Sequence, residues 1–220
     1  MKILAAASFI CGFGLIVLTV YPILSYEVFS KNKYPDLISP VPEGETSNSK
    51  TDYTKASTWF VGDDKSEFNK SKISFYTITI PKLDIENATV AIGGDDLSKS
   101  LIQYPGTALP GKNGNAVIFG HSILPQFYNP DDYMAIFSTL SSLNKGDEIT
   151  IYFDGVTYLY RVYSIFEVKP TDIQVLEQDK SDSFISLVTC TPPGDPRNPR
   201  RLIVKARVIP PDISYANSGN

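Results

Sequence analysis

The chain has 220 residues, of which 42% are hydrophobic and 20% are charged. This composition excludes a disordered chain, and the length suffices for one or two domains with a hydrophobic core. The formal net charge of -4 argues against general binding to the phosphate backbone of nucleic acids. Two Cys and one His are too few for a disulfide framework or for a zinc site made only of Cys and His.

The first predicted element is an apolar helix. From Ile3 to Leu24 the sequence contains no charged side chain, and a helix of this length matches the roughly 30 Å hydrocarbon core of a bilayer. No small-x-small cleavage site follows the apolar run, so we expect an uncleaved anchor over residues 1–26 rather than a removed signal peptide. The positive charges before and after the apolar run are nearly equal in number, so they do not set its orientation. A short N-terminal tail usually stays in the cytoplasm. On that basis we expect the rest of the chain outside the cell.

Residues 27–72 are expected to form a linker or a lid-like spacer. They are rich in Pro and polar residues and show no apolar periodicity. Trp59-Phe60 interrupts this pattern. We expect the pair to dock on the domain that follows, and a flap over a site is the alternative. Residues 211–220 are expected to form a C-terminal tail.

The domain predicted for residues 73–210 is mostly β. Runs rich in β-branched and aromatic residues predict strands at 73–80, 87–92, 115–120, 148–153, 156–168, 184–189 and 202–209. Asp154-Gly155 is a strong signal for a two-residue hairpin turn. The pattern favours a small, mostly antiparallel β-barrel or sandwich over βαβ units.

Two short helices are also predicted within this domain. The first is a capped turn over residues 95–101. The second starts at Pro130 and ends at Gly146, because apolar residues recur there at i, i+4 and i+7. The apolar positions are Ile136, Leu140 and Leu143.

Cys190 is the first candidate for chemistry. It ends an apolar run and is followed by Thr191-Pro192-Pro193-Gly194, which cannot extend a sheet, so we expect an accessible thiol at a strand end. Nucleophilic attack requires the thiolate, and a nearby cation stabilises that form. The candidate cations are Arg197, Arg200 and Arg201. A buried Cys without a catalytic role is the alternative.

His121 is the only histidine in the chain, and it also follows an apolar run. Since Cys11 lies within the N-terminal apolar helix, Cys190 is the only cysteine outside it. A single Cys with a distant His is the pattern of a nucleophile and its base. The alternative for His121 is a half-buried, hydrogen-bonded imidazole.

Several motifs resemble those of the sortases, which are membrane-anchored cysteine transpeptidases of bacterial surfaces. The run 184–192, with Arg201-Leu202-Ile203-Val204 beginning eleven residues after Cys190, is similar to the family's Leu-x-Thr-Cys strand and the next strand, which Arg opens. Segments 105–111 and 115–122 resemble the region that carries the family's His, and residues 80–85 resemble its first strand. The similarity covers residues 73 to 209 and implies a closed or nearly closed antiparallel β-barrel of about seven to eight strands with short helices.

The resemblance implies a role for three residues. Cys190 corresponds to the nucleophile, His121 to the general acid and base, and Arg201 to the group that stabilises the oxyanion. Arg200 would point to the opposite face of its strand. By resemblance, the thiolate attacks the Thr–Gly bond of a Leu-Pro-x-Thr-Gly-like sorting signal, and an amine then resolves the thioacyl-enzyme.

The resemblance also implies partners and a location. The partners are secreted proteins with a C-terminal sorting signal and an amine acceptor from peptidoglycan or a pilin lysine, with no nucleic acid. The chain is expected in the cell membrane with a single pass and an extracellular catalytic domain. The residues expected to bind substrate are Thr189, Ala116 and Ile118.

Other functions stay open from the residues alone. One is an L,D-transpeptidase-like wall enzyme, although the sequence lacks a Ser-x-Gly-Cys-x-Arg run. Another is a non-catalytic, membrane-tethered β-domain that binds a wall component, in which Cys190 would be inert. No cofactor is expected. The Asp pairs at 63–64, 95–96 and 131–132 favour caps and solvated faces over calcium ligands.

Overall fold

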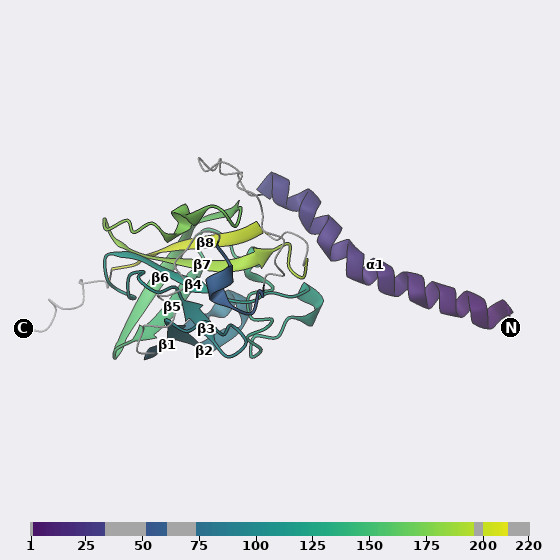
Figure 1. The fold of residues 1–220 in the computed structure, drawn as a ribbon, viewed down its shortest axis with the longest axis horizontal. Helices are drawn as coiled ribbons and strands as arrows, with labels where there is room; N and C mark the ends of the chain where they lie inside the picture. Colours follow the sequence, from purple (N-terminus) through teal and green to yellow (C-terminus); the bar gives the residue numbers. More distant parts are fainter. Residues whose placement is uncertain (1, 34–51, 61–73, 196–199, 211–220) are drawn as a thin grey trace, which may run out of the picture.

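The computed structural model describes residues 2–33, 52–60, 74–195 and 200–210. A long helix, α1 (Lys2–Lys33), projects from one side of a β-domain (Figure 1). Its segment Ser8–Ser30 has a mean hydropathy of 2.0, so by length and composition this helix can cross a membrane. The expected apolar N-terminal helix is therefore present, and it continues beyond residue 26.

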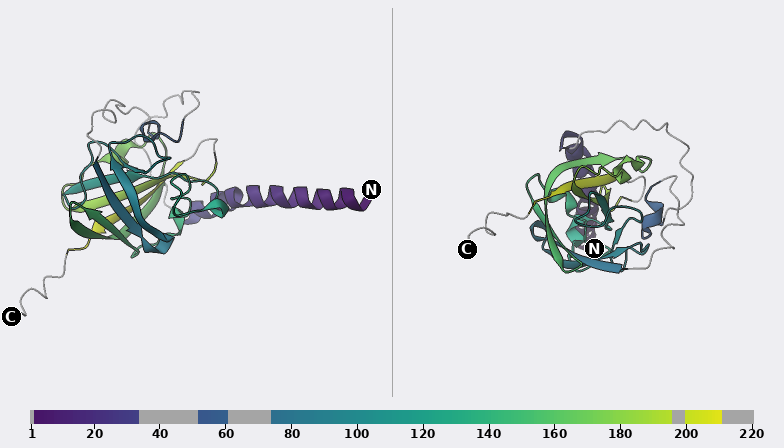
Figure 2. Two further views of the ribbon diagram at one scale, coloured as in Figure 1. Left: turned by 90° about the horizontal axis from the view of Figure 1, so that it is seen from below. Right: turned by 90° about the vertical axis from the view of Figure 1, so that its left-hand side faces the viewer.

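Eight strands in the described part of the chain close into a barrel in the order β1-β2-β3-β4-β7-β8-β6-β5 (Figure 2). Most neighbouring strands are antiparallel, whereas β2 with β3 and β4 with β7 are parallel. This confirms the predicted barrel. The strands are β1 (Ser74–Ile80), β2 (Ile85–Ile92), β3 (Leu101–Gln103), β4 (Gly114–Phe119), β5 (Glu148–Phe153), β6 (Val156–Val168), β7 (Ser183–Thr191) and β8 (Arg200–Val208).

The hairpin between β5 and β6 shows how local sequence sets this topology. Asp154 and Gly155 have φ values of 51° and 76°, the left-handed conformation that a two-residue turn requires. The twist of such a turn matches that of the flanking strands, which pair from Glu148 with Arg161 to Phe153 with Val156. The hairpin predicted from Asp-Gly is confirmed.

Two predicted helices are absent from the described residues. Residues 95–101 form turns that lead into β3, because the Asp96 carboxylate accepts hydrogen bonds from the backbone N and the hydroxyl of Ser98. The Asp132 carboxylate likewise accepts from the backbone N of Met134, and the segment 130–146 folds as turns with one short 3-10 helix at Leu140–Ser142. The apolar residues of that segment are buried as expected, namely Ile136, Leu140 and Leu143.

Short 3-10 helices connect the strands. They are η1 (Ala56–Thr58), η2 (Pro81–Leu83), η3 (Pro125–Phe127), η4 (Leu140–Ser142) and η5 (Ile173–Leu176).

The apolar side chains of the barrel form two separate cores. One contains residues from all eight strands, such as Ile78, Ile118 and Leu187, and fills the barrel interior. The other lies on the outer face of the barrel, where Phe119 and Val188 pack with residues 52–60. We call residues 52–60 the covering segment. Because side chains alternate along a strand, each strand of this wall contributes to both cores.

Candidate active site

Cys190 and Arg201 lie side by side on the outer face of the barrel. They pair across the antiparallel ladder of β7 and β8, and directly opposite residues project from the same face of a sheet. The strand β7 extends through Thr191, and Cys190 is only 7% exposed. The predicted accessible thiol at a strand end is therefore wrong, whereas the expected proximity of Arg201 is confirmed.

His121 reaches the same site from β4. This strand runs parallel to β7, and the backbone N of Gly120 donates to the carbonyl of Val188 at 3.1 Å. A side chain at Gly120 would collide with Phe137, since an added Cβ would lie 2.3 Å from that ring. The absence of a side chain at position 120 lets the backbone pass close to Phe137 and Leu101 just before His121.

A pocket of about 190 Å³ contains both candidate residues. Its lining includes His121 and Cys190, together with Ser122, Ile123 and Tyr53. The Ser122 hydroxyl donates to the carbonyl of Cys190 at 2.9 Å, which fixes the two strand ends against each other. The structure thus brings the sequence-predicted Cys and His to one cavity.

The covering segment binds the guanidinium of Arg201 through hydrogen bonds and aromatic contacts. The Nε and Nη2 atoms of Arg201 donate to the carbonyl oxygen of Trp59 at 3.2 and 2.8 Å. The guanidinium carbon lies 5.2 Å from the ring centroid of Trp59 and 5.7 Å from that of Tyr53. Trp59 and Phe60 dock on the barrel as expected, and Tyr53 also lies over the pocket.

Burial sets the protonation of the site in this closed arrangement. Burial raises the pKa of the Cys190 thiol, and the positive charge of Arg201 opposes that shift. Burial lowers the pKa of His121, and the negative charge of Asp132 opposes it. The Nδ1 atom of His121 has no hydrogen-bond partner among the described residues. The closed site therefore favours a neutral thiol and a neutral imidazole.

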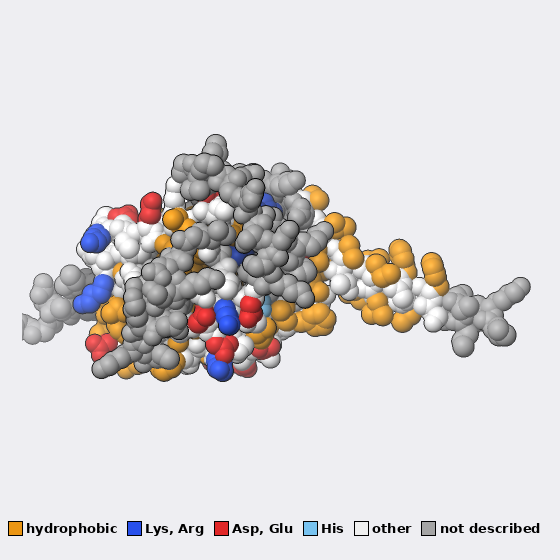
Figure 3. Space-filling view, in the orientation of Figure 1, with side chains coloured by type: hydrophobic (Ala, Val, Ile, Leu, Met, Phe, Trp, Pro, Cys, Tyr) orange, Lys and Arg blue, Asp and Glu red, His pale blue; other side chains and the backbone are white. Residues whose placement is uncertain are grey.

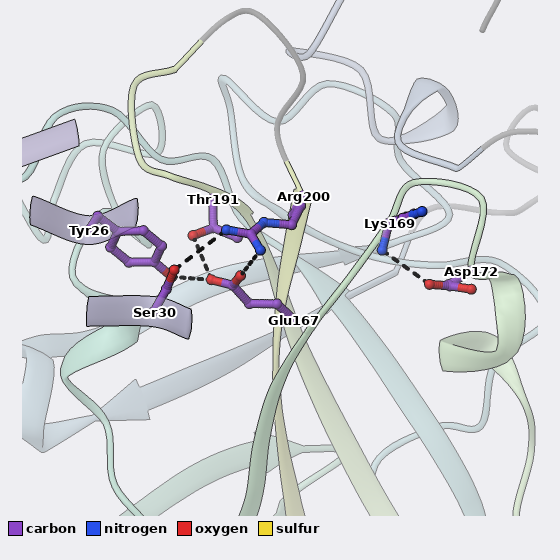
Figure 4. A network of polar contacts seen from close by, with 7 residues as sticks. All are labelled: Tyr26, Ser30, Glu167, Lys169, Asp172, Thr191 and Arg200. Carbon is purple, nitrogen blue, oxygen red and sulfur yellow. Dashed lines mark hydrogen bonds and ion pairs between the residues drawn. The ribbon is translucent and has the colours of Figure 1, made fainter. Parts of the chain in front are cut away.

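A buried carboxylate lies on the opposite face of the same strand ends (Figure 4). Glu167 is 4% exposed; its Oε1 accepts from the Tyr26 and Thr191 hydroxyls at 2.6 and 3.3 Å, and its Oε2 lies 3.2 Å from Nη1 of Arg200. Arg200 pairs with Thr191 in the ladder, one position from Cys190 and Arg201. The prediction that Arg200 points away from the thiol is confirmed. This network joins the end of α1 to the strand ends that carry the site.

The three residues expected to bind substrate lie elsewhere. Ala116 and Ile118 are buried in the interior core of the barrel, and neither lines the pocket. The Thr189 hydroxyl donates to the carbonyl of Gly120 at 2.9 Å, so this residue ties β7 to β4. The side chains of all three point to the face of the sheet opposite to Cys190, because alternate residues of a strand point to opposite faces.

Sequence reasoning missed two residues that shape the site. Tyr53 lies in a segment far from the barrel motifs, and no local pattern singles it out. Glu167 carries a weak signal, since it is an acidic residue in an otherwise apolar stretch near the end of β6.

The acidic pair at 95–96 makes local contacts with neighbouring residues. Asp95 accepts from the backbone N of Ser57 at 2.8 Å, and Asp96 forms an ion pair with Lys99 at 2.8 Å. Across residues 2–33, 52–60, 74–195 and 200–210, no group of three or more His, Cys, Asp or Glu side chains could hold a metal ion. The pair at 63–64 and Arg197 lie outside the described residues.

A thiol and an imidazole in one pocket, with a guanidinium paired to the thiol on a β-barrel wall, define a class of protein. This class comprises enzymes that transfer acyl groups through a cysteine. The family model described as the Sortase domain matches residues 78–209. The chain belongs to the sortase family and is a cysteine transpeptidase.

Several relatives support this assignment. Sortase A of Bacillus anthracis is 27% identical over 174 residues, covering 73% of this chain and 76% of the relative. The structure of a lid mutant of sortase A from Corynebacterium diphtheriae is 30% identical, with a TM-score of 0.55, and the match covers 68% of this chain and 77% of that one. A pilus-related sortase C of Group B Streptococcus is also 30% identical, with a TM-score of 0.53, over 64% of this chain and 70% of that one. The family match favours a sortase over the two alternatives left open by the sequence, an L,D-transpeptidase-like enzyme and a non-catalytic wall-binding domain.

Proposed function

We propose that this chain is a membrane-anchored sortase that cleaves a Leu-Pro-x-Thr-Gly-like sorting signal and transfers the cleaved protein to an amine. The observation that carries the proposal is the pairing of Cys190 with Arg201 in the ladder, with His121 in the same pocket as the thiol. Those positions match the chemistry of a nucleophile, a cationic oxyanion donor and a proton carrier.

The reaction divides between these residues in two steps. The Cys190 thiolate attacks the Thr carbonyl carbon, a C–S bond forms, and the C–N bond to Gly breaks while the His121 imidazolium protonates the leaving amine. An acceptor amine then attacks the thioester, gives its proton to His121 and displaces the thiolate. Arg201 offers charged, planar donors to the oxyanion of both tetrahedral intermediates.

Substrate binding on this scheme requires the covering segment to move. The donors of Arg201 that would meet the oxyanion bond to the carbonyl of Trp59, and Tyr53 lines the pocket. We therefore assign the covering segment the part of a lid that substrate displaces. The remainder of the proposed linker, 34–51 and 61–72, lies outside the described residues.

Both acceptor classes fit this chemistry, because an amine of a peptidoglycan cross-bridge and a pilin lysine are the same nucleophile. The relatives include a sortase A and a pilus-related sortase C, so the proposal covers anchoring to the wall and joining of pilins. In either case α1 holds the enzyme in the cell membrane by a single pass, with the barrel outside the cell, and no cofactor takes part.

The test is incubation of the full chain in detergent micelles with a set of sorting-signal peptides and several amines, followed by mass detection. We expect a peptide cleaved after Thr and joined to the amine, and a covalent adduct on Cys190 when the amine is omitted. Cys190→Ala should abolish both products, while Cys11→Ser should leave them unchanged. A chain that forms no adduct with any signal peptide would overturn the proposal.

A further inference from the structure

The loop that follows the catalytic His lies against α1. This loop contains η3, and the Nε2 atom of Gln126 donates to the carbonyl of Leu18 at 3.4 Å. In the same loop, the Phe127 side chain is 63% exposed. The hydroxyl of Tyr128 donates to the carbonyl of Leu83, which fixes the loop to η2.

The end of α1 is held on the domain by three further contacts. The hydroxyl of Tyr26 donates to Glu167, and Arg200 donates to Ser30 (Figure 4). The ammonium of Lys33 donates to the carbonyl of Ser141 at 2.8 Å. Because these contacts lie on separate strands and loops, they fix the direction in which α1 leaves the barrel.

The length of α1 places η3 inside the outer half of the hydrocarbon core. Lys2 is charged, so the hydrocarbon core begins no earlier than Ile3. From Ile3 to Leu18 a helix rises only about 23 Å at ~1.5 Å per residue. A hydrocarbon core of about 30 Å therefore extends about 7 Å beyond Leu18, and a tilted helix would bring that residue deeper.

The surface around this contact has the chemistry of a membrane interface. A groove of about 360 Å³ separates α1 from η3, lined by Tyr21, Pro22 and Phe29 on the helix and by Pro125 on the loop. Tyr21 is 66% exposed, and Tyr is enriched where a helix leaves the hydrocarbon core. Hydrophobic side chains lie along the described part of α1 where it leaves the domain (Figure 3). The groove thus joins apolar and aromatic residues of α1 to Pro125 of the loop, and its remaining lining residues are Ser25, Tyr26, Ser30, Lys33 and Ser141.

We propose that η3 and this groove bind the outer leaflet of the bilayer that α1 crosses, with Phe127 inserted among the lipids. The inference rests on the proposed single-pass anchor and adds a second membrane contact, made by the catalytic domain itself. The occupant is phospholipid, because the groove is continuous with the membrane-spanning surface of α1 and lies at the depth that the helix length requires.

This membrane contact of η3 would set the distance of the active site from the bilayer. Ile123 lines the pocket and lies two residues before the start of η3, and Leu124 packs against Gly194 of the same pocket. The pocket would therefore open close to the membrane surface.

The test measures the depth of spin labels on the full chain in vesicles of phosphatidylethanolamine and phosphatidylglycerol. In a Cys11→Ser, Cys190→Ala background, single cysteines are introduced as Phe127→Cys and Gln126→Cys in the loop, and as Leu15→Cys in α1. Collision rates with oxygen and with a water-soluble nickel chelate report whether each label lies in lipid or in water.

Phe75→Cys is the matched control. Phe75 is 60% exposed, close to the value for Phe127. It lies five residues before Ile80, which pairs with Ile85 beside η2, so it is about 17 Å from that end of the barrel. Circular dichroism of each labelled variant checks that the barrel is intact.

We expect the oxygen-to-nickel collision ratio at positions 126 and 127 to be several-fold higher than at 75 and to approach the value at 15. A lipid-like ratio at 15 with a water-like ratio at 126 and 127 would overturn the inference and leave the anchor in place. A water-like ratio at 15 would overturn the anchor, and the inference with it. The peptide-transfer assay is independent of all three readings.

Discussion

The covering segment makes a quantitative prediction about access to the thiol. The Trp59 side chain is fully buried, its ring lies 5.3 Å from that of Phe119, and its Nε1 donates to the carbonyl of Tyr53. Truncation of a buried Trp to Ala costs about 3–5 kcal/mol. Since Trp59 belongs to the covering segment, most of that loss should weaken the docking of the segment.

A docking energy lowered by this amount raises the population of the open site. Each 1.4 kcal/mol is worth about tenfold, so Trp59→Ala should raise the open population by about 10² to 10³ or more. The sulfur reacts in the open form, and its modification rate follows that population. In a Cys11→Ser background, we expect methanethiosulfonate to modify Cys190 faster by a similar factor, measured by mass spectrometry.

Lys55→Ala is the control, because Lys55 is an exposed residue of the same segment. It should leave the modification rate unchanged. Thermal unfolding must show that the barrel of Trp59→Ala is still folded at the assay temperature. A folded Trp59→Ala protein whose Cys190 reacts at the wild-type rate would refute the view that this segment closes the pocket.

Three other predictions concern the charges of the site. Arg201→Ala should lower kcat/KM for peptide transfer by about 10² to 10³, with partial recovery in Arg201→Lys, which keeps the charge but loses the planar donors. Glu167→Gln leaves Arg200 without its buried partner and should cost about 2–4 kcal/mol in thermal unfolding, and the double variant Glu167→Gln, Arg200→Gln should recover part of that loss; equal losses in single and double variants would contradict the pairing. Burial raises the pKa of the Cys190 thiol and lowers that of the His121 imidazole, so thiolate and imidazolium coexist in a minor fraction of molecules. The rate of transfer should accordingly rise and then fall with pH, and a flat profile between about pH 5 and 9 would disprove this requirement.

The sequence predicted most strands because their signals are local. The hairpin of β5 and β6 was predicted to the residue, since Asp154-Gly155 sets the turn and β-forming residues flank it. The helix expected over 130–146 failed because the apolar spacing of Ile136, Leu140 and Leu143 also suits a series of turns packed on the barrel. Periodicity reports burial, and side-chain hydrogen bonds to the backbone decide between helix and turn.

The sequence likewise predicted some residues of the candidate site and missed others. The motifs around Cys190 and Arg201 indicated the thiol and its cation, and the ladder pairs them. The interior and exterior faces of β4 could not be told apart, because all six of its residues are buried and no alternation is visible. Ala116 and Ile118 were therefore assigned to the wrong face. Tyr53 reaches the pocket through tertiary docking, which leaves no trace in local sequence.

The hydrogen bonds from Arg201 to the carbonyl of Trp59 have a consequence for ligand selection. A tethered residue of the chain itself, Trp59, competes with every incoming peptide for the same donors. Each tenfold preference for the self-bound state weakens the apparent affinity of a peptide tenfold. A short or poorly matched peptide gains too little binding free energy to overcome this preference, whereas a peptide that also fills the pocket beside Cys190 gains enough. Discrimination between ligands would then depend on the free energy needed to displace Trp59 from Arg201 as much as on the contacts that the ligand makes in its place.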